Sequence, residues 1–308
     1  MSSAIAPALQ WQWLTPRYWP TWLGVACLWF IAFIPWSGRH WLGEKLGKLM
    51  YWHNNKRRHI VLTNLRLCFP KMPADELERL TAQHFAEYGC ALLNYSVLFF
   101  RARNYILQRT SIQGLENITR ATQAQRNVLL LLGHSVWLEF APAAIGQYYA
   151  AYGSYKPFNN PIFNWLIARS RLKDVEFVVA REEGMLKLVR SLRADRLLFF
   201  LPDQDHGLKH STFAPFFATN KATLTSPARI AKMGKTITIP IMAFSDKATE
   251  GYKVIVGEAL HNFGELDAEN NATLMNQAFQ QLIEQAPEQY MWTLKLLRTR
   301  PPNEVSPY

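Results

Sequence analysis

Short apolar stretches alternate with amphipathic ones from about residue 112 to the C-terminus. The apolar stretches predict strands at residues 127–133, 176–180, 196–202, 236–243 and 252–257. The amphipathic stretches predict a helix from about residue 136 and further helices at 182–194, 223–233 and 270–285. This alternation predicts an α/β fold, with a mixed central sheet flanked by helices.

The part of the chain before residue 110 has a helical pattern instead. Residues 38–66 predict an amphipathic helix, and the run from Lys56 to His59 adds a basic face that suits either solvent or lipid headgroups. Pro70 and Pro73 interrupt this helix, and another is expected over residues 76–103. We therefore expect one catalytic domain, 38–308, made of a helical membrane-proximal part, 38–110, and an α/β core, 111–308.

The N-terminal segment, residues 1–37, is expected to be a membrane anchor. The chain is uncharged from Trp19 to Trp36, which would span about 27 Å as a helix, close to the hydrocarbon core of a bilayer. Tryptophans at both ends suit the two interfaces, and a buried core helix is the alternative. Basic residues follow the run while only Arg17 precedes it, so the catalytic domain is expected on the cytoplasmic side.

Composition and charge narrow the possible partners. Hydrophobic residues make up 49% of the chain and charged residues 19%, which excludes general disorder. The net charge of +11 indicates an anionic partner, such as lipid phosphates, an acidic carrier protein or nucleic acid. No nucleic-acid partner is expected, because the basic residues are dispersed and form no recognised module. The three cysteines lack metal-ligand spacing, and their odd number favours a reducing compartment.

His134 and Glu139 are the first candidates for catalysis. The apolar stretch from Val128 to Leu132 leads through Gly133 to the histidine, and the glutamate follows five positions later. Imidazole titrates near neutral pH and can accept a proton from a hydroxyl, while a carboxylate can fix its tautomer. On one regular helix the two side chains would lie about 140° apart, so His134 is expected in the turn and Glu139 in the first turn of the next helix.

The same stretch allows a serine hydrolase as an alternative. Gly133, Ser135 and Trp137 nearly match the G-x-S-x-G elbow that places a nucleophilic serine after a strand. Trp137 stands where the elbow requires a glycine for close packing of strand and helix. This substitution disfavours the hydrolase.

Further polar residues are candidates for substrate binding. Cations in the turn-rich loop from Tyr155 to Pro161 and in the segment after it suit phosphate or carboxylate groups, although a solvated surface explains them equally well. Arg181 follows an expected strand and could instead pair with a neighbouring glutamate. A second apolar strand leads into two acids and a histidine, a weak metal-ligand pattern that suits positioning of a substrate group better. The candidates are Lys156, Asn160, Arg169, Arg171, Arg181, Asp203 and Asp205.

In order along the chain, several motifs together resemble one family. They are the segments Thr15–Gly24, Asn64–Met72, His134–Glu139, Tyr155–Pro161, Leu201–Gly207, Pro287–Trp292 and Arg298–Pro301. The chain resembles the membrane acyltransferases that share an H-x4-D/E motif, and more closely the lipid A biosynthesis acyltransferases of Gram-negative bacteria.

This resemblance implies transfer of a fatty acyl chain, of the lauroyl or myristoyl class, from acyl carrier protein to a hydroxyl on an acyl chain of a lipid A precursor. It implies that His134 is the general base, that Glu139 orients and stabilises the histidine, and that no covalent acyl-enzyme forms. It assigns phosphate recognition to Arg181 and leaves the roles of Asp203 and Asp205 open, since the wider superfamily has Pro-Glu-Gly there. Lys156 departs from the arginine of some relatives.

The implied partners are acyl carrier protein, an anionic lipid A precursor and membrane lipids, at the cytoplasmic side of the bacterial inner membrane. Neither a cofactor nor a metal is expected. Two alternatives stay open: a glycerolipid or lysophospholipid acyltransferase with the same motif, and a non-catalytic membrane-bound protein that binds the carrier.

Overall fold

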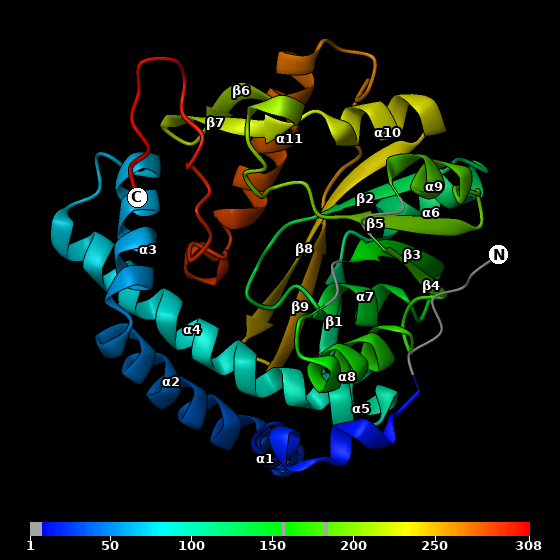
Figure 1. The fold of residues 1–308 in the computed structure, drawn as a ribbon. Helices are drawn as coiled ribbons and strands as arrows, with labels where there is room; N and C mark the ends of the chain where they lie inside the picture. The colour runs from blue at the N-terminus through cyan, green and yellow to red at the C-terminus, as the bar shows by residue number, and fades with distance from the viewer. Residues whose placement is uncertain (1–7, 156–157, 181–183) are drawn as a thin grey trace.

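A seven-stranded sheet runs through the centre of the fold in the order β1-β9-β8-β2-β5-β3-β4 (Figure 1). This computed structural model describes residues 8–155, 158–180 and 184–308. Neighbouring strands are parallel except for the β8–β9 pair, so the expected mixed sheet is confirmed. The strands are β1 (Thr110–Gln113), β2 (Val128–Leu132), β3 (Ala150–Tyr155), β4 (Phe177–Ala180), β5 (Arg196–Phe200), β8 (Ile237–Asp246) and β9 (Gly251–Val256).

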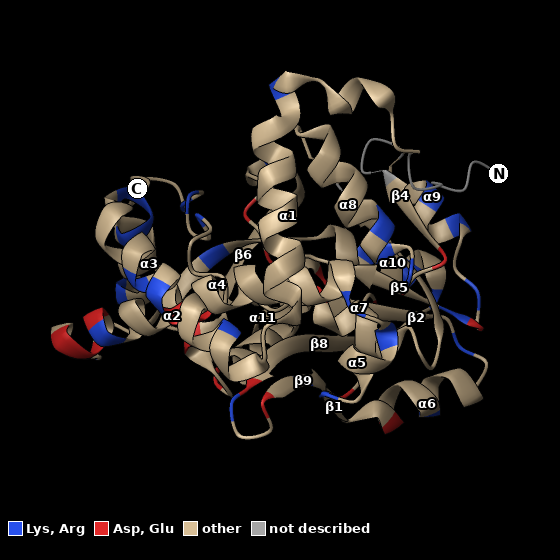
Figure 2. Ribbon diagram, turned by 90° about the horizontal axis from the view of Figure 1, so that it is seen from below, with Lys and Arg blue, Asp and Glu red and all other residues tan. Residues whose placement is uncertain are grey.

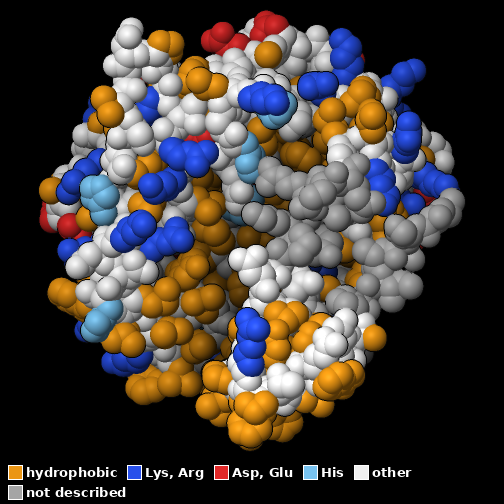
Figure 3. Space-filling model, viewed as in Figure 1, with side chains coloured by type: hydrophobic (Ala, Val, Ile, Leu, Met, Phe, Trp, Pro, Cys, Tyr) orange, Lys and Arg blue, Asp and Glu red, His pale blue; other side chains and the backbone are white. Residues whose placement is uncertain are grey.

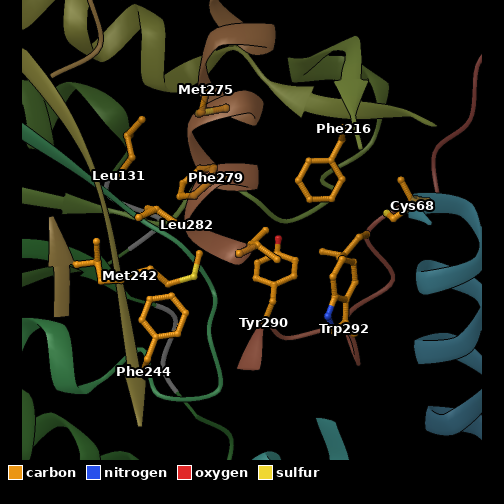
Figure 4. Packing of buried hydrophobic residues seen from close by; sticks show 14 of the residues in the cluster. Cys68, Leu131, Phe216, Met242, Phe244, Met275, Phe279, Leu282, Tyr290 and Trp292 are labelled. Atoms are coloured by element: carbon orange, nitrogen blue, oxygen red, sulfur yellow. The ribbon is translucent and has the colours of Figure 1, made fainter. Parts of the chain in front are cut away.

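Helices pack on both faces of the sheet. Every residue of β2 is buried, and alternate residues enter different cores: Leu129 and Leu131 belong to one, and Leu130 to the other. Figure 4 shows the first core, where Leu131 and Met242 from the sheet lie near Phe279 of α11. The helices after residue 100 are α5 (Arg103–Leu107), α6 (Leu115–Gln123), α7 (Phe140–Ile145), α8 (Pro161–Arg171), α9 (Met185–Arg190), α10 (Ser226–Gly234) and α11 (Ala268–Ile283).

The expected strands are all present to within a few residues, but the structure also has strands that were not expected. The edge strand β1 and the strand β3, which lies next to the other edge, have no strong apolar alternation, and β3 is rich in small residues. A separate antiparallel hairpin, β6 (Ser211–Phe216) and β7 (Thr219–Leu224), precedes α10. The helix expected from residue 223 therefore begins at Ser226, because the residues before it are paired in the hairpin.

Between residues 8 and 100, four α-helices lie beside the sheet: α1 (Trp19–Phe33), α2 (Trp36–His53), α3 (Asn55–Cys68) and α4 (Ala74–Phe100). In Figure 1, α4 runs along the body of the protein and α2 covers its outer side. The single helix expected over residues 38–66 is two helices. The Asn54 side chain accepts a hydrogen bond from the Arg57 amide and so caps the start of α3.

The prediction that one helix runs from Trp19 to Trp36 is wrong. Ile34 adopts an extended conformation before Pro35, which ends α1 at Phe33, and α2 begins at Trp36. The buried Arg39 side chain donates to the Ile34 carbonyl and to Asn94 of α4, which fixes this break. A helix of 15 residues is about 22 Å long. Among the described residues, no helix is both long and apolar enough to cross a membrane, so the spanning anchor is not confirmed.

Glycines allow α2 and α4 to approach closely. A Cβ atom on Gly47 would lie 2.1 Å from the Phe85 carbonyl oxygen, and one on Gly89 would lie 2.3 Å from the Gly43 carbonyl oxygen. Both distances are well below van der Waals contact, and the obstructing atoms belong to the backbone. Any side chain at these positions must therefore separate the two helices.

We expect Gly89→Ala to lower the free energy of unfolding by about 1–3 kcal/mol, because overpacking forces α2 away from α4. Gly24→Ala in α1 is the matched control, since a Cβ there would meet no atom within 4 Å. The control is expected to be neutral or to stabilise by up to about 1 kcal/mol through helix propensity. Urea unfolding of the detergent-solubilised protein measures both variants. Equal effects at the two positions would contradict the close-packing argument.

Candidate active site

The register of two neighbouring parallel strands brings His134 and Asp203 together. Strands β2 and β5 pair so that Val128 lies opposite Leu197 and Leu131 opposite Phe200. Both strands end at the same edge of the sheet, where α/β proteins usually bind their ligands. The same register, continued past the strand ends, sets His134 opposite Asp203, which is 69 positions further along the chain.

Asp203 holds both the ring and the backbone of His134. The ring Nδ1 forms a short hydrogen bond with Asp203 Oδ1, and the backbone amide of His134 donates to Oδ2 over 2.8 Å. Tyr290 also donates its hydroxyl to Oδ2 over 3.0 Å. The Gln204 amide nitrogen lies 3.0 Å from the other ring nitrogen, Nε2, and donates to it. Nδ1 therefore carries the ring proton, and Nε2 presents a lone pair.

The surroundings of Asp203 favour its ionised form. Burial by itself opposes ionisation, but the charge of a protonated His134 and the two hydrogen bonds from that residue outweigh it, with a smaller contribution from the buried Lys221. The pKa of Asp203 is consequently lowered from its usual range. The ionised Asp203 carboxylate can accept a hydrogen bond from the N–H group at His134 Nδ1, and it can stabilise the imidazolium that forms when the ring takes a second proton.

The segment around Tyr290 fixes the loop that carries His134. The amide of Met291 donates to the His134 carbonyl over 2.8 Å, and the amide of Val136 donates to the Gln289 carbonyl over 2.8 Å. These backbone bonds, together with the Tyr290 hydroxyl, hold the histidine loop and Asp203 from the same side. The C-terminal part of the chain thus completes the site.

Glu139 lies at the start of α7, as expected, but its partner is not His134. Its carboxylate forms a bidentate ion pair with Arg171, in which the Arg171 Nε donates to Oε2 over 3.0 Å. The expectation that Glu139 orients the histidine ring is thus corrected, because Asp203 occupies that position. Both members of the Glu139–Arg171 pair line the same cavity as His134.

This cavity has a volume of about 600 Å³, within the usual range for ligand pockets. His134, Gln204, Glu139 and Arg171 are polar members of its lining. Most of the remaining wall is apolar and suits an aliphatic chain: Leu132, Leu138, Pro142, Val175, Val178, Met185, Leu188, Phe199, Phe200, Leu201 and Leu224. A hydroxyl bound at His134 Nε2 could lose its proton to the ring while an acyl chain occupies the apolar wall.

Three other candidates lie outside the cavity lining. The Asn160 side chain caps the start of α8 and donates to Thr21 of α1. Arg169 is exposed and stacks near the Trp165 ring. Asp205 accepts hydrogen bonds from the amide and hydroxyl of Thr299, and so ties the loop after β5 to the C-terminal segment. Substrate contact by these residues stays a prediction, as it does for Lys156 and Arg181, which lie outside the described residues.

The geometry does not favour the serine-hydrolase alternative. Ser135 is fully buried, and its hydroxyl accepts a hydrogen bond from the Trp137 amide. The Trp137 ring is buried as well and donates to Glu87 over 3.2 Å, so it fills the place of the elbow glycine with a packed side chain. Within the described ranges, no three His, Cys, Asp or Glu side chains converge as metal ligands would.

Sequence reasoning missed Gln204 and Tyr290 as members of the site. Gln204 lies between two aspartates, which were chosen as candidates in its place because they are charged. It follows the end of β5 as they do, and its amide contacts His134. Tyr290 comes from a segment without regular periodicity, and only the tertiary structure shows that its hydroxyl reaches Asp203.

Comparison with known proteins confirms the resemblance drawn from the motifs. The family model described as bacterial lipid A biosynthesis acyltransferase matches residues 6–299. The lipid A biosynthesis lauroyltransferase of Escherichia coli (strain K12) is 33% identical over 297 residues, which cover 96% of this chain and 96% of that protein. The lipid A biosynthesis myristoyltransferase of the same strain is 34% identical over 297 residues, which cover 95% of this chain and 91% of that protein. The lipid A biosynthesis palmitoleoyltransferase of that strain is 30% identical over 298 residues, which cover 96% of this chain and 97% of that protein.

Proposed function

This chain belongs to the bacterial lipid A biosynthesis acyltransferases, and we propose that it transfers a fatty acyl chain from acyl carrier protein to a hydroxyl on an acyl chain of a lipid A precursor. The observation that carries the proposal is the His134 ring, whose Nδ1 is held by Asp203 while the residue lines an apolar cavity. That arrangement suits a general base acting beside a bound aliphatic chain.

In the proposed reaction, Nε2 of His134 takes the proton of the acceptor hydroxyl. The Gln204 amide lies where that hydroxyl would bind, so it must shift to share or release Nε2. The acceptor oxygen attacks the thioester carbonyl and forms the new C–O bond. The C–S bond then breaks, and the imidazolium returns its proton to the departing thiolate. Asp203 stabilises the imidazolium throughout, and no acyl-enzyme forms.

We assign Glu139 and Arg171 to the polar wall beside the reacting groups. A guanidinium and a carboxylate that neutralise one another provide both a donor and an acceptor to a substrate without a large net charge. A polar group of the acceptor next to its hydroxyl is the contact we propose for them. Glu139 thus assists catalysis through the substrate, and Asp203 acts on the base.

The apolar wall is proposed to hold one of the acyl chains. Three relatives of this chain are named for lauroyl, myristoyl and palmitoleoyl transfer, and their sequence identities to it are similar. Membership of the family therefore does not by itself select a chain length. We propose the lauroyl or myristoyl class for this chain. The net charge of +11 supports an acidic carrier protein as donor and an anionic glycolipid as acceptor. No cofactor enters the proposed reaction.

Exposed aromatic side chains support contact with the cytoplasmic face of the inner membrane. Seen from below in Figure 2, α1 carries no acidic or basic residue along its length. Figure 3 shows hydrophobic side chains along the lower edge of the molecule, where Figure 1 places α1 and α2. We propose that these side chains enter the headgroup region: Trp19, Leu23, Trp29, Phe30, Phe33, Trp41 and Trp52.

Transfer to two acceptors tests the proposal. The purified full-length protein, given lauroyl- or myristoyl-acyl carrier protein, is expected to add one acyl chain to a lipid A precursor, seen as a new ester by mass spectrometry. It is expected to transfer at least about a hundredfold more slowly to lysophosphatidate, because that acceptor leaves polar contacts of the site unmade.

The opposite preference would make the chain a glycerolipid acyltransferase. No transfer to either acceptor, together with retained binding of the carrier protein, would favour the non-catalytic alternative.

A further inference from the structure

The cavity that contains His134 has a second polar region, formed by the loop after β5 and the start of α10. Its members are His206, His210, Thr225, Ser226 and Arg229, and they are distinct from the Glu139–Arg171 pair. Figure 3 shows histidine side chains at the edge of a hydrophobic hollow on this face, with lysine and arginine side chains around it. We call these five residues the Arg229 region.

Among the described residues that line the cavity, the positive and negative charges do not balance. Glu139 is the one carboxylate among the described lining residues, and it is already paired with Arg171. The Arg229 guanidinium makes no hydrogen bond or ion pair with any residue in the described part of the chain. Its charge is therefore available to a bound anion, and His210, which lines the same cavity, can add a donor.

Backbone contacts hold this region together. The amide of Thr225 donates to the His210 carbonyl over 3.0 Å, and its hydroxyl donates to the same carbonyl over 3.2 Å. The segment between β5 and β6, which ends at His210, also contains Asp203 and Gln204, both of which contact His134. One short loop thus connects the base to the Arg229 region, and a substrate at the base extends naturally toward it.

We propose that the Arg229 region binds a phosphate group of a substrate while the reacting atoms lie at His134. This inference rests on the proposed function, which supplies two phosphates of suitable chemistry. One is the phosphodiester of the carrier protein's phosphopantetheine arm, and the other is a phosphate on the sugar headgroup of the acceptor. An arginine with neighbouring hydroxyl and imidazole donors suits either of them.

Equilibrium titrations of the full-length protein test the site without turnover. The probes are 4′-phosphopantetheine against pantetheine, and glucosamine 1-phosphate against glucosamine. One phosphorylated probe is expected to bind about tenfold more tightly than its phosphate-free partner, because charge-assisted hydrogen bonds are lost without the phosphate. Arg229→Gln is expected to remove that difference, and Arg229→Lys to keep part of it.

Lys232→Gln is the matched control, since Lys232 is exposed on the same helix and does not line the cavity. It is expected to bind both probe pairs as the unchanged protein does. Thermal unfolding checks that each variant is folded. The probe pair that responds to Arg229→Gln identifies the source of the phosphate as donor or acceptor.

Kinetics then connect the site to transfer. Arg229→Gln is expected to raise KM about tenfold for the substrate whose phosphate it binds, with kcat nearly unchanged. Replacing that substrate with a phosphate-free counterpart, an acyl N-acetylcysteamine thioester or a dephosphorylated acceptor, is expected to abolish the difference between variant and unchanged protein. Equal binding of both members of each probe pair, or an Arg229→Gln variant that still discriminates them, would overturn the proposal. A protein that discriminates the probes but transfers nothing would refute the proposed function alone.

Discussion

His134→Ala is expected to lower kcat for acyl transfer about a thousandfold, because general-base catalysis by a positioned side chain contributes about that much. His134 combines a lone pair on Nε2 with a hydrogen bond from Nδ1 to the buried Asp203 carboxylate, which can stabilise the resulting cation. The KM for the acceptor is expected to change little, since the apolar wall remains intact. Steady-state transfer from acyl carrier protein to a lipid A precursor measures both constants.

Two variants control this result. His261→Ala removes an exposed histidine that lies outside the cavity lining, and it is expected to transfer at the normal rate. Ser135→Ala is also expected to retain most activity, because the buried Ser135 hydroxyl serves the Trp137 amide. A His134→Ala rate within tenfold of the normal one would refute the base assignment. Complete loss in Ser135→Ala with a folded protein would restore the hydrolase alternative.

The position of the active site could be predicted because buried strands are easy to recognise. Two fully apolar stretches lead directly into polar residues, at His134 and at Asp203, and in α/β folds such strand ends meet at one edge of the sheet. The sequence therefore identified both residues as candidates. It also placed His134 in the loop after its strand and Glu139 at the start of a helix, and the structure agrees.

The pairing of these residues could not be predicted, because it depends on strand order and register. Glu139 is close to His134 in the sequence, which made it the natural partner for the ring. The strands β2 and β5 are neighbours only in the folded sheet, although β3 and β4 lie between them in the chain. Their register sets Asp203 opposite His134, whereas the rotation of the chain into α7 turns Glu139 toward Arg171.

Composition predicted the apolar N-terminus well and its geometry poorly. A hydropathy average treats Ile34 and Pro35 as part of one continuous apolar stretch. The backbone of a residue before a proline disfavours the helical conformation, however, and α1 ends there. The buried contact of Arg39 with the Ile34 carbonyl and Asn94 then fixes the direction in which α2 leaves. That contact joins residues far apart in the chain, and no local pattern reports it.

Asp203→Asn is expected to reduce kcat about a thousandfold or more, because it places the ring proton on the wrong nitrogen. The backbone amide of His134 and the Tyr290 hydroxyl both donate to Oδ2, so the amide oxygen of the new side chain must face them. Its NH2 group then faces Nδ1, which has to accept a hydrogen bond. The ring proton moves to Nε2, and Nε2 can no longer take a proton from the acceptor. Transfer kinetics across pH 5–9 measure the loss, which is expected at every pH.

Asp205→Asn separates this tautomer effect from damage to the loop. Asp205 is two positions away but binds Thr299 and the Gly207 amide, so its variant is expected to lower thermal stability while kcat per folded molecule stays within a few-fold. Acid unfolding gives a second, independent readout for Asp203. Its pKa is lowered in the folded protein, so its contribution to stability is present above the usual range of an aspartate and is lost as pH falls through the folded value. The stability difference between the unchanged protein and Asp203→Asn should therefore shrink below about pH 4. Similar kinetic losses in the two aspartate variants would show that loop integrity, and not the tautomer of His134, limits transfer.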